Sequence, residues 1–549
     1  MKRLAFIVIV SLIGCTSPEQ SADMVLLNGN IWTANPTQVN ARAIAISADT
    51  IMDIGSQAKI RRYIGDSTQV IDLEGNFVTP GFIDSHVHFI SGGFRLSSVQ
   101  LRDAVTPEDF IQRIATFAQT LEPGTWITGG DWDHENWGGE LPHREWIDSV
   151  TQNHPLWINR LDGHMALANT AAMKTAHVTK EIEEAAGGEI VRDEEGELTG
   201  IFKDNAMSWI EKAVPEPSDQ QKDKALEAAM KYVTAQGVTS VHHMSGYMDV
   251  LERFRDEGKL ITRIYAGMPI HQWKKLADKI SEEGVGDKWL RIGSLKGFMD
   301  GSLGSHTAAF FDPFTDAPED SGFFITTKEE MYGWVKKADS AGLQPMIHAI
   351  GDRAISELLD IYTEVVQENG ARDRRFRIEH SQHIVPKDFG RYNSLGVIAS
   401  MQPYHAIDDG RWAEKVIGPE RIQTTYAFRS LLDEGVRLAF GSDWFVAPPT
   451  PLEGIYAAVT RRTLDGQNPE GWVPEQKISV EEALRAYTIN AAFASFEENI
   501  KGTLEIGKLA DMVVIDRDLF KINPSQIKEA KLLMTIIGGK IVYQSEEEL

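Results

Sequence analysis

Two histidines separated by a single residue, His86 and His88, are the part of this sequence that most directly suggests chemistry. They follow the apolar run Gly81-Phe82-Ile83, so we expect a short strand on which both imidazoles project to the same side. Two neutral imidazoles on one rigid strand supply half of a metal site. The same spacing also suits two partly buried histidines on an edge strand, so the choice depends on residues further along the chain.

Three polar residues end apolar runs later in the chain: His348, His380 and Asp443. If these runs are parallel strands of one barrel, their C-terminal ends lie around one mouth, where such barrels place their functional groups. Together with His86 and His88 they would bring four histidines and a carboxylate to that mouth, a ligand set that suits zinc or a similar divalent metal. A single one of these histidines is more simply explained as structural, but the whole set is not.

Lys296 lies between apolar neighbours in Ser294-Leu295-Lys296-Gly297-Phe298. A lysine that points into a barrel must find a partner or lose its charge, because an isolated buried ammonium group is costly. The local pattern alone is equally consistent with a lysine on the surface.

The elements that must position these residues follow a repeated order. Residues 220–490 repeat an amphipathic helix, a glycine, an apolar strand and a polar residue, with Gly237, Gly342 and Gly435 at the junctions. This order predicts alternating β and α units on a parallel sheet, and the length of 549 residues favours a closed (β/α)8 barrel over an open doubly wound sheet. Because no glycine-rich phosphate-binding motif is present, nothing supports nucleotide binding.

The rest of the chain does not follow this repeated order of helix, glycine and strand. Short apolar runs at both ends, including a hairpin signal at Asn28-Gly29-Asn30, predict one sheet domain assembled from the two termini. Residues from about 100 to 220 do not repeat the β/α unit and are rich in tryptophan, so we expect an insertion that covers the mouth of the barrel.

The first residues resemble a bacterial lipoprotein signal. Lys2 and Arg3 precede an apolar run that is too short to span a bilayer, which is typical of a secretory signal peptide. The run ends in Leu12-Ile13-Gly14-Cys15, which resembles a lipoprotein cleavage box. The resemblance implies a signal peptide over residues 1–14, a lipid anchor on Cys15, a tether over 15–23 and an extracytoplasmic position, on the outer membrane of a Gram-negative cell. An uncleaved N-terminal anchor is the alternative.

Composition excludes several classes of partner and chemistry. The formal net charge of -25 argues against a nucleic-acid partner or direct attraction to an anionic membrane, since both require a positive field. Cys15 is the only cysteine, so an internal disulfide is impossible and no thiol nucleophile is expected deep in the fold. The sequence does not indicate an oligomeric state.

The combined motifs resemble the amidohydrolase superfamily, and within it the amidohydrolase 3 branch that includes N-substituted formamide deformylases. The resemblance covers residues from about 24 to 545. It rests on His86-x-His88, Gly129-Gly130-Asp131-Trp132, Asp162-Gly163-His164, Lys296 to Gly304, His348 to Ala354, Ile378-Glu379-His380 and Gly441-Ser442-Asp443.

This resemblance implies a metal-dependent hydrolase built on a distorted (β/α)8 TIM-like barrel over 81–499, with a β-sandwich composed of 24–80 and 500–549. It implies that His86, His88 and Asp443 hold one divalent metal, for which the ligand types favour zinc, and that His348 and His380 hold a second where two are present. Lys296 would be carboxylated and would bridge the two metals. Many relatives carry an acidic residue in place of His243, so His242 and His243 receive no role.

The implied reaction is hydrolysis of a carbon–nitrogen bond in a small non-peptide amide by a metal-activated water. Asp443, Lys296 and His380 are then the catalytic residues, with Asp443 taking a proton from water and delivering it to the leaving amine. Hydrolysis of an ester, lactone or cyclic amide at the same site is one alternative, and a lipoprotein that binds metal and ligand without turnover is another. The candidates for substrate contact are His164, Asp300, Ser302 and His306.

Overall fold

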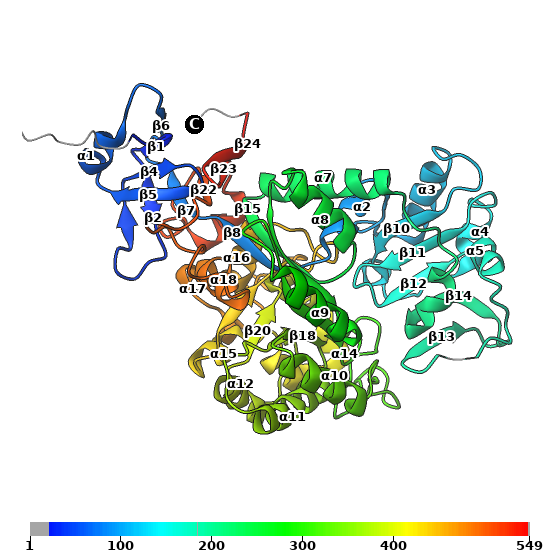
Figure 1. Ribbon diagram of the computed structural model, residues 1–549. Coiled ribbons are helices and arrows are strands. Elements are labelled where there is room, and N and C mark those ends of the chain that lie inside the picture. The colour runs from blue at the N-terminus through cyan, green and yellow to red at the C-terminus, as the bar shows by residue number, and fades with distance from the viewer. Residues whose placement is uncertain (1–20, 184, 547–549) are drawn as a thin grey trace, which may run out of the picture.

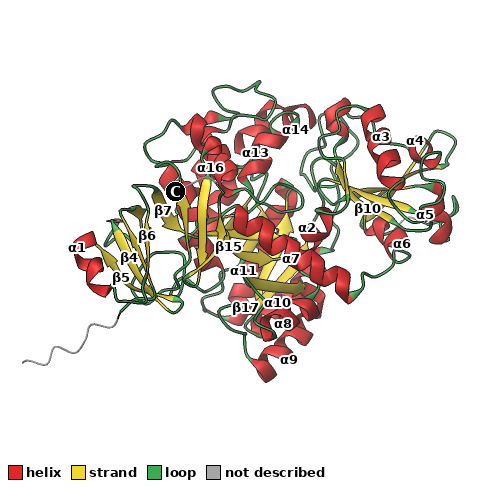
Figure 2. Cartoon of the chain, turned by 90° about the horizontal axis from the view of Figure 1, so that it is seen from above, coloured by secondary structure: helices red, strands yellow, loops and turns green. Residues whose placement is uncertain are grey.

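A computed structural model of the chain describes residues 21–183 and 185–546. At its centre, eight parallel strands follow one another in the chain order that alternating β and α units predict (Figures 1 and 2). A backbone bridge between Val87 and Trp444 joins the first strand to the segment after the last, so the barrel is nearly closed. Its strands are β8 (Phe82–Val87), β15 (Val238–His243), β16 (Arg263–Pro269), β17 (Leu290–Phe298), β18 (Gln344–Ala349), β19 (Arg377–His380), β20 (Ile398–Met401) and β21 (Leu438–Phe440).

Helices cover the outside of the barrel, and local sequence chemistry explains where they begin and end. In α10 (Lys328–Ser340) the Thr327 side chain accepts a hydrogen bond from the backbone of Glu330, whose own side chain returns to the Thr327 backbone. Met331 and Val335 are fully buried, and burying a side chain of this size stabilises the fold by about 1.5–3 kcal/mol. The other helices of the repeated units include α7 (Asp219–Ala235), α8 (Met248–Asp256), α9 (Trp273–Glu283), α11 (Asp352–Asn369), α12 (Phe389–Leu395) and α15 (Phe428–Asp433).

Both ends of the chain contribute to two further sheets, which lie side by side in Figure 1. Leu26 and Ile44 of one sheet share an apolar core with Val78 and Met512 of the other. The first sheet has the order β5 (Thr50–Gly55), β4 (Ala43–Ser47), β1 (Met24–Leu27), β6 (Gln69–Asp72); the second has the order β24 (Lys540–Gln544), β23 (Leu532–Ile537), β22 (Met512–Ile515), β7 (Phe77–Pro80), β2 (Asn30–Trp32), β3 (Asn40–Ala41).

The predicted hairpin at Asn28-Gly29-Asn30 is wrong. β1 pairs with β4 and β6, whereas β2 pairs with β3 and β7 in the other sheet. Asn28 has a left-handed backbone with φ of 57°, as in a tight turn, but the turn carries the chain from one sheet to the next. The apolar residues on both sides enter the core between the sheets, so burial determines the pairing here.

Residues 99–204 build a separate sheet of six strands, drawn in cyan on the far side of the barrel from the chain ends in Figure 1. Its helix α3 (Pro107–Ala118) and its strands bury one apolar cluster that contains Trp132 and Ile158. The sheet has the order β13 (Gly188–Arg192), β14 (Leu198–Asp204), β12 (Met165–Ala168), β11 (Leu156–Arg160), β10 (Ile127–Trp132), β9 (Val99–Gln100).

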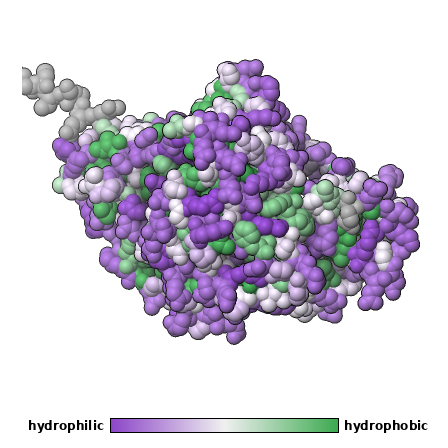
Figure 3. Space-filling view, turned by 90° about the horizontal axis from the view of Figure 1, so that it is seen from below, coloured by the Kyte–Doolittle hydropathy of each residue, from purple (hydrophilic) through white to green (hydrophobic). Residues whose placement is uncertain are grey.

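The predicted signal peptide over residues 1–14 and the lipidation of Cys15 lie outside the described residues and stay predictions, as do the domain boundaries at 81 and 499. In the described part of the chain, the search for a helix with the length and apolarity of a membrane span finds none. The face in Figure 3 is mainly hydrophilic with small apolar areas, in keeping with the 25% of charged residues.

Candidate metal centre

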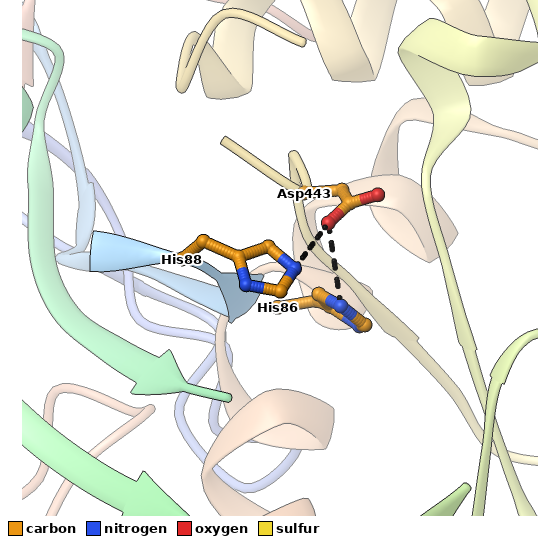
Figure 4. A group of neighbouring side chains, drawn as sticks. All are labelled: His86, His88 and Asp443. Atoms are coloured by element: carbon orange, nitrogen blue, oxygen red, sulfur yellow. Dashed lines mark ion pairs between the residues drawn. The ribbon is translucent and has the colours of Figure 1, made fainter. Parts of the chain in front are cut away.

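His86, His88 and Asp443 meet where the first and last strands of the barrel lie side by side (Figure 4). Asp443 Oδ1 lies 3.4 Å from His86 Nε2 and 3.3 Å from His88 Nε2. This oxygen is buried and has no hydrogen-bond donor among the described residues. The three residues offer ligand atoms that all lie within 4.8 Å of one another. Two imidazole nitrogens and an unpartnered carboxylate oxygen fit a divalent cation such as zinc.

A buried ion pair fixes the His86 ring. Glu379 Oε2 accepts a hydrogen bond from His86 Nδ1 at 2.5 Å, and Arg377 holds Glu379 with bonds of 2.7 and 3.0 Å. All three side chains are fully buried. Because Nδ1 donates, Nε2 keeps its lone pair and faces Asp443. A carboxylate that orients a histidine in this way is typical of metal sites.

The backbone on both sides of the site is held by a second carboxylate, Asp84. It accepts bonds from the Ser442 amide and hydroxyl at 2.9 and 2.5 Å and from the His86 amide at 3.2 Å. Asp443 has φ of 60° and His380 has φ of 72°, which residues with a β-carbon rarely adopt. Such strained positions cluster at functional sites and require support from their surroundings.

His348 and His380 lie next to this group, with ring centroids 4.4 Å apart. His348 Nε2 donates to the Gly301 carbonyl at 2.9 Å, which leaves its Nδ1 as the lone-pair nitrogen. His380 Nδ1 donates to Gln402 Oε1 at 2.9 Å, which leaves Nε2 free. The structure therefore places all five ligands expected from the sequence around one end of the barrel.

Lys296 is buried inside the barrel, in the second half of β17. Its Nζ lies 3.2 Å from His86 Nε2 and 4.8 Å from the centroid of the Phe298 ring. Among the described residues no carboxylate lies within ion-pair distance of it. Burial lowers the pKa of Lys296 to about 8. At pH 7 a minority of the molecules then carries Lys296 as the neutral, nucleophilic amine, and this fraction grows as the pH rises through about 8.

The electrostatics of the site favour the metal-binding forms of its ligands. Burial, together with the Lys296 ammonium, holds the pKa of His86 well below its usual value. Burial also lowers the pKa of His348 and His380 well below the usual range. Burial alone would raise the pKa of Asp443, but the adjacent His86 and His88 more than offset it and hold that pKa below the usual range. Neutral imidazoles and an ionised carboxylate are the states that bind a metal.

His242 and His243, which received no role from the sequence, are both engaged away from the metal ligands. His242 Nδ1 accepts a bond from Arg377 at 2.9 Å. His243 Nδ1 accepts from the Phe89 amide at 3.2 Å and its Nε2 donates to the Gly246 carbonyl at 3.0 Å. Both therefore support the barrel framework.

The four candidates for substrate contact separate into two groups. His164 and Ser302 line the pocket that also contains His88, Lys296 and Asp443. Asp300 does not line it; its buried carboxylate accepts backbone N–H groups from Ala309, Ile350 and Gly351. His306 does not line it either, and pairs with Asp316 at 3.0 Å.

Several pocket residues were not identified from the sequence. Arg160 of β11 binds Asp162 at 2.7 Å and Asp133 at 3.0 Å, so the six-stranded sheet supplies charged groups to the pocket wall. His405, on the helix that follows β20, also lines the pocket. The rule that selected His380, a polar residue just after a barrel strand, would have drawn attention to the segment that contains Gln402 and His405.

An eight-stranded parallel barrel with histidines and a carboxylate at its C-terminal end defines a metal-dependent hydrolase. The chain belongs to the amidohydrolase family, whose model matches residues 69–543. This confirms the family predicted from the motifs.

Individual relatives match over nearly their whole length. The chain is 40% identical over 537 residues to Protein LONG AFTER FAR-RED 3 of Arabidopsis thaliana, covering 95% of this chain and 92% of that protein. It is 28% identical to an N-substituted formamide deformylase of Arthrobacter pascens, with 96% and 99% covered. A crystal structure of an uncharacterized metal-dependent hydrolase from Pyrococcus horikoshii superposes with a TM-score of 0.73 at 28% identity, covering 91% of this chain and 99% of that one.

Proposed function

We propose that this chain hydrolyses the carbon–nitrogen bond of a small non-peptide amide. The observation that carries the proposal is Asp443, whose unpartnered Oδ1 lies between two imidazole nitrogens beside a pocket. The relative from Arthrobacter pascens is named for deformylation of N-substituted formamides, so this class of amide is the first substrate to test.

His86, His88 and Asp443 are proposed to hold a divalent metal, with zinc the best match to their donor atoms. When bound, such a metal supplies an activated water at neutral pH and polarises a substrate carbonyl. Asp443 is ionised, so its carboxylate accepts the proton of the attacking water and then returns it to the nitrogen of the departing amine. Amine and carboxylic acid are the products, and one water is consumed.

Lys296 is proposed to react with carbon dioxide. Its neutral amine forms an N–C bond to the carbon of carbon dioxide and releases one proton, which gives a carbamate anion. The reaction would replace a buried amine that has no carboxylate partner by an anionic oxygen donor, on a side chain whose Nζ lies 3.2 Å from His86 Nε2. Lys296 would then supply a ligand atom and would no longer place an unpaired positive charge inside the barrel.

Paired substrates test the proposed reaction. The zinc-loaded full chain is mixed with N-butylformamide or with butyl formate, and the release of formate is followed. We expect the chain to release formate from the amide. Release of formate from the ester but not from the amide would establish an esterase instead. Bound metal without hydrolysis of either compound would overturn the proposed function.

Asp443→Asn tests the proton transfer. Loss of general acid–base catalysis should lower the rate by about 100–10,000-fold while the fold is retained. The matched control is Asp433→Asn, since the Asp433 side chain is 68% exposed at the end of α15 and its loss should leave the rate unchanged. Near-normal activity of Asp443→Asn would remove Asp443 from the mechanism.

A further inference from the structure

The pocket that contains His88, Lys296 and Asp443, called the metal pocket from here on, is small. Its volume is about 70 Å³. A buried water needs about 10–15 Å³ of free volume, so the metal pocket has room for roughly five water-sized groups. The reacting water and an amide group fill most of this space. A substrate with a larger substituent therefore needs space outside the metal pocket.

A much larger cavity, called the side cavity from here on, lies between the six-stranded sheet and the barrel. Its volume is about 740 Å³, within the range of about 300–1,000 Å³ that is usual for small-molecule sites. Its walls include residues of α2 (Phe89–Arg95), of α6 (Ser208–Glu211) and of the sheet strands β10 and β11. Six aromatic residues line it: Phe94, Phe117, Trp126, Trp157, Tyr247 and Phe445.

Phe445 lies where the two spaces meet. Its ring centroid is 5.7 Å from that of His88, which lines the metal pocket. The guanidinium carbon of Arg95, which lines the side cavity, lies 4.5 Å from the same ring centroid. The metal centre and the side cavity are thus joined through a single aromatic ring.

The proposed reaction determines which part of an amide lies next to Phe445. Asp443 returns a proton to the departing nitrogen, so that nitrogen must lie within hydrogen-bond distance of the Asp443 carboxylate. Asp443 Oδ1 is 3.3 Å from His88 Nε2, and the His88 ring contacts Phe445. The nitrogen and its substituent therefore lie on the Phe445 side, whereas the acyl group stays in the metal pocket.

The charges of the side cavity favour a neutral or cationic group. Arg95 donates to Asn159 at 2.9 Å and lies 3.3 Å from Asp131, so its charge is already compensated. Glu211 and Glu216 also line the cavity, and Glu211 has no ion-pair partner among the described residues. An anionic group would meet like charge here, whereas a cation would be attracted both to the carboxylates and to the aromatic faces.

We infer that the side cavity binds the nitrogen substituent of the substrate, and that this substituent is an aromatic group, neutral or cationic. The inference rests on the proposed function and specifies its substrate class, a formamide whose nitrogen carries such a group. The aromatic group stacks against the Phe445 ring where it leaves the metal pocket. The side cavity thus selects the amine half of the substrate, and the metal pocket limits the acyl half to the size of a formyl group.

Thr128→Trp tests the inference by filling the side cavity. Thr128 of β10 lines the cavity and pairs directly with Trp157 of β11, so the two side chains project to the same face. The variant should lower kcat/KM for N-(naphthylmethyl)formamide by at least about 10-fold and leave kcat/KM for N-methylformamide unchanged. Thr128→Ser is the matched control and should leave both values unchanged. An equal loss for both compounds, or no loss for the naphthyl compound, in a folded Thr128→Trp chain would overturn the inference.

Glu211→Lys tests the charge preference. The wild type should hydrolyse a formamide with an aminomethylbenzyl group on nitrogen faster than one with a carboxybenzyl group, and Glu211→Lys should reverse this order. Glu195→Lys is the matched control, because Glu195 is exposed between β13 and β14 and does not line the side cavity. A wild-type chain that prefers the carboxybenzyl compound would contradict the inferred class of substituent.

Binding of naphthylmethylamine, the amine product, gives a readout independent of turnover. Isothermal titration calorimetry on the full chain should detect this binding for the wild type and show its loss for Thr128→Trp. Hydrolysis of N-methylformamide by a wild-type chain that does not bind the naphthyl amine would overturn the role of the side cavity while the proposed function stands. Binding that Thr128→Trp abolishes, in a chain that hydrolyses no formamide, would support the side cavity as an aromatic binding site and overturn the proposed function.

Discussion

Replacing Gly441 by alanine should disturb the metal centre through the backbone alone. A β-carbon at this position would lie 2.5 Å from the His86 amide nitrogen, 2.8 Å from Asp84 Oδ1 and 3.0 Å from the His86 β-carbon. Ordinary contact begins near 3.4 Å, so β8 and the segment after β21 must separate by 0.9 Å, the difference between 3.4 and 2.5 Å. The His86 amide and β-carbon are fixed by the backbone of β8, and Asp84 Oδ1 is held by hydrogen bonds from the amides of His86 and Ser442. None of these atoms can rotate away from the added β-carbon.

The expected magnitudes follow from this clash. Overpacking of this kind costs about 1–3 kcal/mol, and for a chain of 549 residues the entropy of unfolding converts this to a fall of about 1–3 °C in the thermal midpoint. Because the shift moves His86 relative to Asp443, zinc affinity should fall about 10–100-fold, as it does when the support of a metal ligand is lost.

The assay is zinc competition against a chromophoric chelator, with the thermal midpoint measured on the same samples. Gly333→Ala in α10 is the matched control, since nothing lies within 4 Å of its added β-carbon. Removing a helical glycine should stabilise the fold by about 0.5–1 kcal/mol and leave zinc affinity unchanged. Zinc binding by Gly441→Ala as tight as that of the wild type would refute the reasoning.

Three further perturbations test other parts of the site. Glu379→Gln should weaken zinc binding about 10–100-fold, because His86 loses its charged acceptor; unchanged affinity in the competition assay would contradict this. The Arg160 guanidinium holds the pKa of Asp162 below its usual range despite burial, so Asp162 stabilises the fold above about pH 4, the pKa of the unfolded chain, and less as the pH falls further. Asp162→Asn should therefore lower the free energy of unfolding by about 1.5–3 kcal/mol at pH 7 and by less at pH 3, and the thermal midpoint measured at each pH reports the difference. An equal loss of stability at both pH values would be evidence against the ion pair. Chelation of the metal should lower the wild-type midpoint by about 2 °C when zinc had been present at 100 times its Kd, and a midpoint that does not move would argue against a metal bound by the folded state.

Much of the barrel could be predicted from the sequence because its signals are local. Gly342 closes a helix and an apolar run follows it, which predicts the strand that carries His348, and the run from Phe376 to Glu379 predicts the strand that carries His380; the structure has both strands. Asp443 follows the last of these runs at the same end. The position of each ligand depends on one strand only, and a parallel barrel gathers strand ends at one mouth.

Other features depend on contacts that are distant in sequence. Glu379 belongs to a predicted motif, but its role comes from His86, 293 residues away. His405 lies on α13 (Pro403–Asp409), and its closeness to Asp443 follows from how this helix sits over the mouth. The hairpin prediction at Asn28-Gly29-Asn30 failed for the same reason, since the apolar core shared by two sheets determined the pairing instead of the turn.

The composite sheet at the chain ends sets an order of events during protein synthesis. β7 ends at Pro80 and its neighbour β22 begins at Met512, so 512 − 80 = 432 positions separate the two partners. At about 5–20 residues per second, a ribosome needs about 20–90 s to cover that interval. Throughout this time one edge of β7 has unpaired backbone groups, a template for pairing with another nascent chain. One of the first strands to be made is thus among the last to be completed.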